Sequence, residues 1–304
     1  MEHDPYTISV LTSNILATDL MSDICESPAE TAARYEMAVK FYQESLVDFI
    51  LVQEADELVA EIMYNNGMTT LIKDMSARSD GSRLLIIIWN PLIWQLVQDI
   101  TEDCQAAYEQ SHGNYPFRGQ AAMFMRADGV GCGICNVHGA GKFPKVLEDV
   151  LDIILPIFDE SIPVIIGGDM YSTPAAQCEP YGFKIAMSYY ATASHDFTTD
   201  KDGNIVYLPH RTKPDLFLYR GLKQPKLSLQ GDFEAPYKYI EACGPGTYTM
   251  SQLDQCRNSS LVSPYVVSKP KHFSKTCHKY TRKTKAVASN WFSDHKAFNA
   301  VFWL

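Results

Sequence analysis

The chain has 304 residues, of which 46% are hydrophobic and 20% charged, and its formal net charge is −10. These proportions are those of a globular protein, and they exclude disordered, collagen-like and coiled-coil chains. The longest strongly apolar run, Leu84–Trp89, is far shorter than the roughly 20 residues that span a bilayer. The first residues lack the basic and apolar parts of a secretory signal, so we expect a cytoplasmic protein with no stable membrane insertion, unless the chain was trimmed or is exported by another route.

Apolar runs bounded by turn residues predict the strands, and helical spacing predicts the helices between them. In chain order, the expected strands are residues 6–14, 49–53, 83–89, 121–126, 131–137, 164–168, 215–219 and 297–303. The expected helices are residues 29–45, 56–64 and 145–158. Because neither a repeat nor a linker divides the chain, we predict one mixed α/β domain over residues 1–304.

The cysteines are spread along the chain without the short spacing of disulfide-stapled domains, so reduced thiols are expected. Cys132 and Cys135 form a CxxC pair inside an expected strand. An offset of three residues places two strand side chains on opposite faces. This spacing argues against a zinc site at the pair.

Two segments are rich in loop-forming residues, and we expect long surface excursions near residues 188–210 and 225–285. The second overlaps a basic stretch, because residues 258–293 contain seven Lys or Arg and no Asp or Glu. Such a stretch is typical of a lip that binds anions, and equally of a solvated basic loop. Both interpretations stay open.

Polar residues gather at the ends of the expected strands. They are amides, carboxylates and histidines: Asn14, Gln53, Glu54, Asn136, His138, Asp169, Asp294 and His295. Strand ends in layered α/β sheets converge on a crevice, where catalytic groups collect from distant parts of the sequence. We find no nucleophile elbow and no glycine-rich phosphate loop. Oxygen ligands favour Mg²⁺ or Mn²⁺ over zinc.

Six segments in this order resemble the motifs of the endonuclease/exonuclease/phosphatase superfamily, which includes DNase I-like nucleases, deadenylases, sphingomyelinases and inositol polyphosphate 5-phosphatases. The opening is most similar to the deadenylase-type branch. The segments are residues 12–16 (TSNIL), 51–54 (LVQE), 136–138 (NVH), 167–174 (GGDMYSTP), 214–219 (PDLFLY) and 293–295 (SDH).

The resemblance implies a four-layered α/β sandwich of two packed mixed β-sheets flanked by helices. It also implies a metal held chiefly by Glu54 and supported by Asn14, with Asp169 positioning and deprotonating the attacking water. Asp294 would help to hold the metal or the water.

Two histidines complete the implied site. His138, and His295 paired with Asp215, would stabilise charge on the phosphoryl oxygens or protonate the leaving group. Arg118, Gln120 and Lys142 are candidate phosphate contacts, although a solvated surface position explains each of them as well.

The chain departs from the superfamily pattern in two places. Tyr171 stands where the motif has an Asn that contacts the scissile phosphate, and a tyrosine cannot replace that amide without rearrangement. Ser82 stands where many members have a carboxylate that orients the histidine at position 138, with Asp80 as the nearby substitute.

The sequence thus predicts a Mg²⁺- or Mn²⁺-dependent phosphodiesterase acting on nucleic acid. RNA or single-stranded ends are favoured as substrates because the chain is acidic overall. Two alternatives are a phosphatase or phospholipase that acts on a small phosphorylated head group, and a degenerate binding module, which Tyr171 suggests.

Overall fold

The structure is a computed structural model that describes residues 4–15, 24–25, 28–75, 84–112, 117–139, 151–154, 156–170, 178–187, 193–199, 205–212, 215–230, 237–238, 247–248, 265–267, 278–279, 282–285 and 297–304. Within these ranges, no helix has the length and apolar character needed to cross a membrane.

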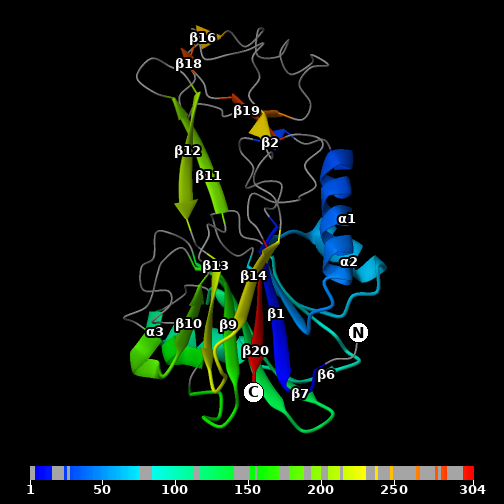
Figure 1. Ribbon diagram of the computed structural model, residues 1–304, viewed down its shortest axis with the longest axis vertical. Helices are drawn as coiled ribbons and strands as arrows, with labels where there is room; N and C mark the ends of the chain where they lie inside the picture. Colours follow the sequence, from blue (N-terminus) through cyan, green and yellow to red (C-terminus); the bar gives the residue numbers. More distant parts are fainter. Residues whose placement is uncertain are drawn as a thin grey trace.

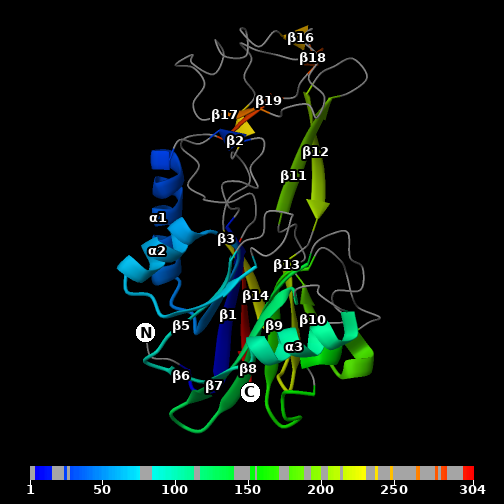
Figure 2. The same cartoon turned by 180° about the vertical axis from the view of Figure 1, so that it is seen from behind.

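Two six-stranded mixed sheets pack face to face (Figures 1 and 2). The first has the order β14 (Lys226–Gln230), β20 (Ala297–Trp303), β1 (Thr7–Asn14), β3 (Phe49–Ala55), β5 (Leu84–Trp89), β4 (Thr70–Asp74). The second has the order β10 (Lys184–Met187), β13 (Asp215–Arg220), β9 (Val164–Asp169), β8 (Gly131–His138), β7 (Gly119–Arg126), β6 (Trp94–Asp99). In both sheets most neighbours run antiparallel, while β1 with β3 and β8 with β9 run parallel.

Helices cover the outer faces of both sheets and complete four layers. Helices α1 (Pro28–Glu44) and α2 (Glu57–Asn65) pack on the first sheet, and α3 (Thr101–His112) packs on the second (Figures 1 and 2). The three layer interfaces correspond to three separate clusters of buried apolar residues. The predicted four-layered α/β sandwich is therefore confirmed.

Strand β3 shows why these segments are continuous apolar runs. Phe49 and Leu51 point into the interface between the sheets, whereas Ile50 and Val52 point toward the helices. A strand buried on both faces needs apolar residues at every position. The same alternation separates Cys132 from Cys135, which lie in different clusters as the sequence predicts.

All eight expected strands are present, with ends within two residues of those predicted, and α1 and α2 are confirmed. Of the expected helix at residues 145–158, the described helical part is residues 151–154, and a turn follows at 156–157. Strands β4, β6 and β10, the helix α3 and the 3-10 turn Glu179–Tyr181 were not predicted. The missed strands β4, β6 and β10 carry exposed positions, which weakens their apolar pattern.

Strands also occupy parts of the two segments that were expected to be loops. β11 (Ala193–Thr199) and β12 (Ile205–Thr212) form a hairpin, and β14 extends the first sheet by pairing with β20. In β14, Leu227 and Leu229 alternate with polar residues and pack on the inner cluster, a period-two pattern hidden by the polar composition. The remaining short strands are β2 (Ile24–Cys25), β15 (Tyr237–Lys238), β16 (Thr247–Tyr248), β17 (Tyr265–Val267), β18 (His278–Lys279) and β19 (Arg282–Lys285).

The hairpin leads directly to one end of the sandwich. It rises from the end of the sandwich opposite the chain's C terminus (Figure 1). β12 ends at Thr212, three residues before Asp215, and Asp215 is the Cα partner of Asp169. The hairpin is therefore attached beside the polar strand ends.

Candidate active site

Four of the predicted site residues meet at one end of the sandwich. Asn14 and Glu54 come from β1 and β3 of the first sheet, and His138 and Asp169 from β8 and β9 of the second. One ligand atom each from Glu54, His138 and Asp169 lies within 4.8 Å of the others. Asn14 Nδ2 donates a hydrogen bond of 3.1 Å to Asp169 Oδ2 and so joins the sheets across this cluster.

An irregularity in β3 places the Glu54 carboxylate. The register with β5 shifts between Val52 and Ala55, and Glu54 adopts a left-handed backbone conformation with φ 53°. Such a conformation costs a non-glycine residue about 1–2 kcal/mol, and strain of this kind is concentrated at functional sites. Glu54 is buried, and its Oε1 lies 3.2 Å from His138 Nε2.

The neighbours of His138 act on the pKa of its imidazole in opposite directions. Burial of the imidazole opposes protonation, but the contact with Glu54 and the charge of Asp169 outweigh it, and the pKa of His138 is raised. Arg118 acts in the opposite direction. The sequence left the orienting partner of His138 in doubt at Ser82, which lies outside the described residues; in the structure, Glu54 contacts this imidazole.

Gly168 allows β9 to bring Asp169 to the site. Its φ is 147°, and a Cβ atom built on it would lie 1.9 Å from the Val137 carbonyl oxygen. Only glycine tolerates both this conformation and this approach. The strand therefore passes close to β8, and Asp169 lies fully buried beside His138, its Cα partner.

The donor set suits a hard divalent cation. Glu54, Asp169 and Asp215 are carboxylates with at most 6% of their surface exposed, and Asp215 is the Cα partner of Asp169. Gathering buried negative charges is unfavourable unless a cation compensates them. The Glu54 and Asp169 carboxylates, which lie with His138 within 4.8 Å, are the kind of oxygen donors that Mg²⁺ or Mn²⁺ prefers.

Two of the candidate phosphate contacts lie within the described residues. Arg118 lies beside the cluster, whereas the Gln120 side chain is engaged elsewhere. The Arg118 carbonyl accepts a hydrogen bond from the His138 backbone N–H, and the residue is 5% exposed. Gln120 is buried, and its Nε2 donates to the Leu71 carbonyl oxygen in the other sheet. The expectation for Gln120 is therefore wrong, because its side chain links the sheets. The predicted residues outside the described ranges are Lys142, Tyr171, Asp294 and His295.

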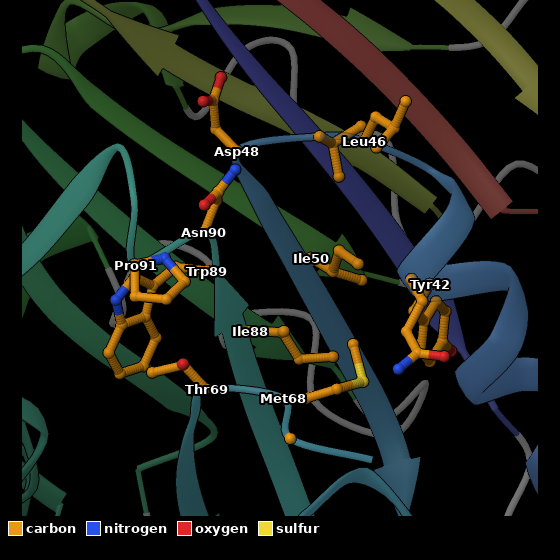
Figure 3. Close-up of a pocket in the computed structure, with 13 residues that line it drawn as sticks. Tyr42, Leu46, Asp48, Ile50, Met68, Thr69, Ile88, Trp89, Asn90 and Pro91 are labelled. Atoms are coloured by element: carbon orange, nitrogen blue, oxygen red, sulfur yellow. The ribbon is translucent and has the colours of Figure 1, made fainter. Parts of the chain in front are cut away.

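A separate pocket of about 200 Å³ lies at the opposite end of β3 (Figure 3). Asp48, just before β3, lines it, as do Ile50 and Ile88 on neighbouring strands. The Asp48 carboxylate accepts hydrogen bonds from Ser9 N, Ser9 Oγ and Trp94 Nε1 at 2.7, 2.8 and 3.0 Å. Asp48 is thus engaged in holding strands together, and the pocket is distinct from the cluster around Glu54.

No family model matches the chain, and no curated protein matches it in sequence. Solved structures do match. An endonuclease/exonuclease/phosphatase family protein from Bacteroides thetaiotaomicron is 13% identical with a TM-score of 0.52, covering 99% of this chain and 98% of that one. The chain has the DNase I-like fold of the endonuclease/exonuclease/phosphatase superfamily. At such low identity the similarity establishes the fold alone.

Two further structures with this superfamily fold are informative. D. rerio TDP2 complexed with single strand DNA product is 11% identical, with a TM-score of 0.50, covering 98% of this chain and 99% of that one. A mannosyl-6-phosphatase from Bacteroides thetaiotaomicron is 13% identical, with a TM-score of 0.52, covering 98% of this chain and 100% of that one. Proteins of this fold therefore include one bound to a nucleic acid and one that is a phosphatase.

Proposed function

We propose that the protein is a divergent superfamily member that hydrolyses phosphoesters with a divalent metal, Mg²⁺ or Mn²⁺. The observation that carries the proposal is the meeting of Glu54, His138 and Asp169 within 4.8 Å at the end of both sheets. Two carboxylates and an imidazole drawn from separate strands, with Asn14 hydrogen-bonded to one of them, form the kind of constellation that phosphoester hydrolysis requires.

Each residue of the cluster would have a separate role in hydrolysis. When bound by Glu54 with support from Asn14, the metal would neutralise the non-bridging phosphate oxygens. Asp169, held in place by the Asn14 amide, would orient a water molecule and accept its proton. His138 would donate a hydrogen bond to a phosphoryl oxygen as negative charge develops there, a role that its raised pKa favours.

Six further residues, four of them outside the described ranges, would complete this site. Asp215, buried beside Asp169, would orient His295 for protonation of the leaving group, and Asp294 would help to hold the metal or water. Arg118 and Lys142 would contact the substrate phosphate. Tyr171 would replace the superfamily's asparagine next to it.

A phosphodiester in nucleic acid is the substrate that we favour, with RNA or single-stranded ends preferred. The single strand DNA product bound to D. rerio TDP2 supports a nucleic acid, and the basic stretch at residues 258–293 would supply phosphate contacts if it forms the anion-binding lip. The mannosyl-6-phosphatase with the same fold favours, as a second candidate, a small phosphorylated head group. The Tyr171 substitution favours a third, a binding module without turnover.

The test is a substrate panel with Mg²⁺ or Mn²⁺: single-stranded RNA and DNA, duplex DNA, bis-p-nitrophenyl phosphate, sugar phosphates, inositol phosphates and sphingomyelin. We expect cleavage of single strands that falls on the order of 100-fold or more in Glu54→Gln and in His295→Ala. Glu57→Gln, an exposed carboxylate three residues away, is the matched control and should cleave normally. Unchanged rates in the first two variants would overturn the site, and folded protein that cleaves nothing would favour the binding module.

A further inference from the structure

The Glu54 side chain lies on the face of β3 opposite to the one that regular strand alternation predicts. Ile50 and Val52 point toward the helices, so an undistorted strand would point Glu54, two residues later, the same way. His138 lies on the inner side of β8, since Ile134, four residues earlier, belongs to the cluster between the sheets. The contact between Glu54 and His138 therefore requires β3 to break its alternation.

A β-bulge makes that break. Val52 pairs with Ile86, and Ala55 pairs with Leu84, so two residues of β3 oppose one residue of β5. Glu54 takes the left-handed φ of 53° within the bulge, and Ala55 returns to the helix-covered face. Bulges re-aim side chains at the cost of interrupted ladder hydrogen bonds, which must be satisfied in another way.

Asn136 in the opposite sheet donates hydrogen bonds to backbone carbonyl oxygens beside the bulge. Its Nδ2 donates to the carbonyl oxygens of Val52 and Ile86, at 2.9 and 3.1 Å, which are the last regular pair before the bulge. Its Oδ1 accepts a 2.7 Å hydrogen bond from Gln53 Nε2. Asn136 and Gln53 are both fully buried, so these bonds are not exchanged with water.

We propose that Asn136 is a positioning residue that stabilises the bulge in β3 and thereby turns the Glu54 carboxylate into the metal site. The inference rests on the proposed function for its metal, but the bulge itself does not. Asn136 lies two residues before His138, and its partner Gln53 directly precedes Glu54. One amide pair thus ties together the two strands that carry the facing ligands.

The first experiment measures Mn²⁺ binding to the full chain by electron paramagnetic resonance of the free ion, together with the melting temperature. We expect Asn136→Leu, or Asn136→Ser if the leucine variant does not fold, to raise the Kd for Mn²⁺ roughly tenfold or more. Ile134→Ala, a buried change on the same strand face, lowers the melting temperature without touching the bulge, and its Kd should stay within about twofold of wild type. A Kd in the Asn136 variants equal to that of Ile134→Ala would overturn the proposal.

A second experiment needs no metal. Denaturant unfolding in EDTA compares the effect of the Asn136 substitution in the wild type, in Glu54→Gly and in Glu54→Gln. Glycine adopts a positive φ without strain. We therefore expect the Asn136 substitution to lower the folding equilibrium constant less in the Glu54→Gly background than in the wild type, by a factor that is at least about threefold smaller. Glu54→Gln removes the charge but keeps the strained backbone, and should show the full wild-type effect.

The two experiments separate the two proposals. Equal effects of the Asn136 substitution in all three backgrounds would overturn the role of Asn136, whatever the metal result. Absence of Mn²⁺ binding in the wild type, with non-additive unfolding in EDTA, would contradict the proposed function and leave Asn136 as the residue that supports the bulge.

Discussion

Asp169 and Asp215 lie directly opposite each other on the antiparallel strands β9 and β13, and both side chains are fully buried. Two neighbouring carboxylates in such a place repel each other unless other charges compensate them. Under the proposed function Asp215 orients His295, and an amide cannot replace the carboxylate in that role, so we expect Asp215→Asn to lower hydrolysis by about 100-fold or more. Mn²⁺ affinity, measured alongside, should change little, since the proposed ligands Glu54 and Asn14 remain. Loss of metal binding in Asp215→Asn would instead make Asp215 a ligand.

Gly168→Ala should destabilise the protein by more than about 3 kcal/mol, because its Cβ would meet the Val137 carbonyl in a conformation that only glycine adopts readily. Gly129 provides the comparison. It has a φ of 88°, but a Cβ there meets nothing within 4 Å, so Gly129→Ala should cost about 1 kcal/mol from backbone strain alone. Urea unfolding of the two variants measures the difference, and equal losses would show that the close approach to β8 is unimportant.

Asp48→Ala should lower the free energy of unfolding by about 2–4 kcal/mol, because it leaves the Ser9 and Trp94 donors without their acceptor. Activity per folded molecule should be retained, since Asp48 and Glu54 lie at opposite ends of β3. Ser9→Ala, which removes a single hydroxyl, should cost about 1 kcal/mol. Denaturant melts and active-site titration test both statements, and inactive but folded Asp48→Ala would contradict the second.

Alkaline pH should destabilise the fold through its buried thiols. Burial raises the pKa of Cys104 from 9.0 to about 12, against a smaller opposing effect of Lys73. Because the unfolded thiol ionises first, the stability that Cys104 contributes is complete below pH 9 and is lost as the pH rises toward about 12. Cys104→Ala should therefore flatten the fall in stability between pH 9 and 11. Parallel slopes in the variant and the wild type would contradict this assignment.

Tyr171→Asn separates an active enzyme from a degenerate one. Restoring the amide of the superfamily motif should raise the rate of hydrolysis if the tyrosine has weakened phosphate contacts. It should lower the rate if the ring binds the substrate, for example by stacking on a base. Tyr171→Phe, which keeps the ring and removes the hydroxyl, identifies the second case by retaining activity. A folded protein that stays inactive in all three forms would favour the binding module.

Much of the fold could be predicted because most strands of the sandwich are buried on both faces. Continuous apolar runs such as Leu84–Trp89 have few alternative interpretations. β14 was hidden because half of its residues are polar and partly exposed, and the hairpin of β11 and β12 because its composition is that of a loop. These elements are specified by pairing with distant strands, which a local pattern does not contain.

The meeting of Asn14, Glu54, His138 and Asp169 at one end of the sandwich could be predicted, because polar residues at the ends of strands in layered α/β sheets converge at one edge. Their geometry could not. Alternation alone places Glu54 on the wrong face of β3, and the bulge that corrects it depends on Asn136, more than eighty residues later in the chain. Glu54 and His138 are likewise more than eighty residues apart in the sequence, so their contact could not be predicted either.

Gly167 has no side chain, and Leu51 and Phe217 fill the space beside it: a Cβ there would lie 2.7 and 2.6 Å from them. The distance between the two sheets near the site is therefore set by the fit of apolar side chains around a glycine. Since Glu54 belongs to one sheet and Asp169 to the other, that fit also sets the separation of their carboxylates. Under the proposed function, substitutions at Leu51 or Phe217 would therefore alter the separation of the metal-binding carboxylates, and with it the preference for a larger or smaller cation, without changing a ligand.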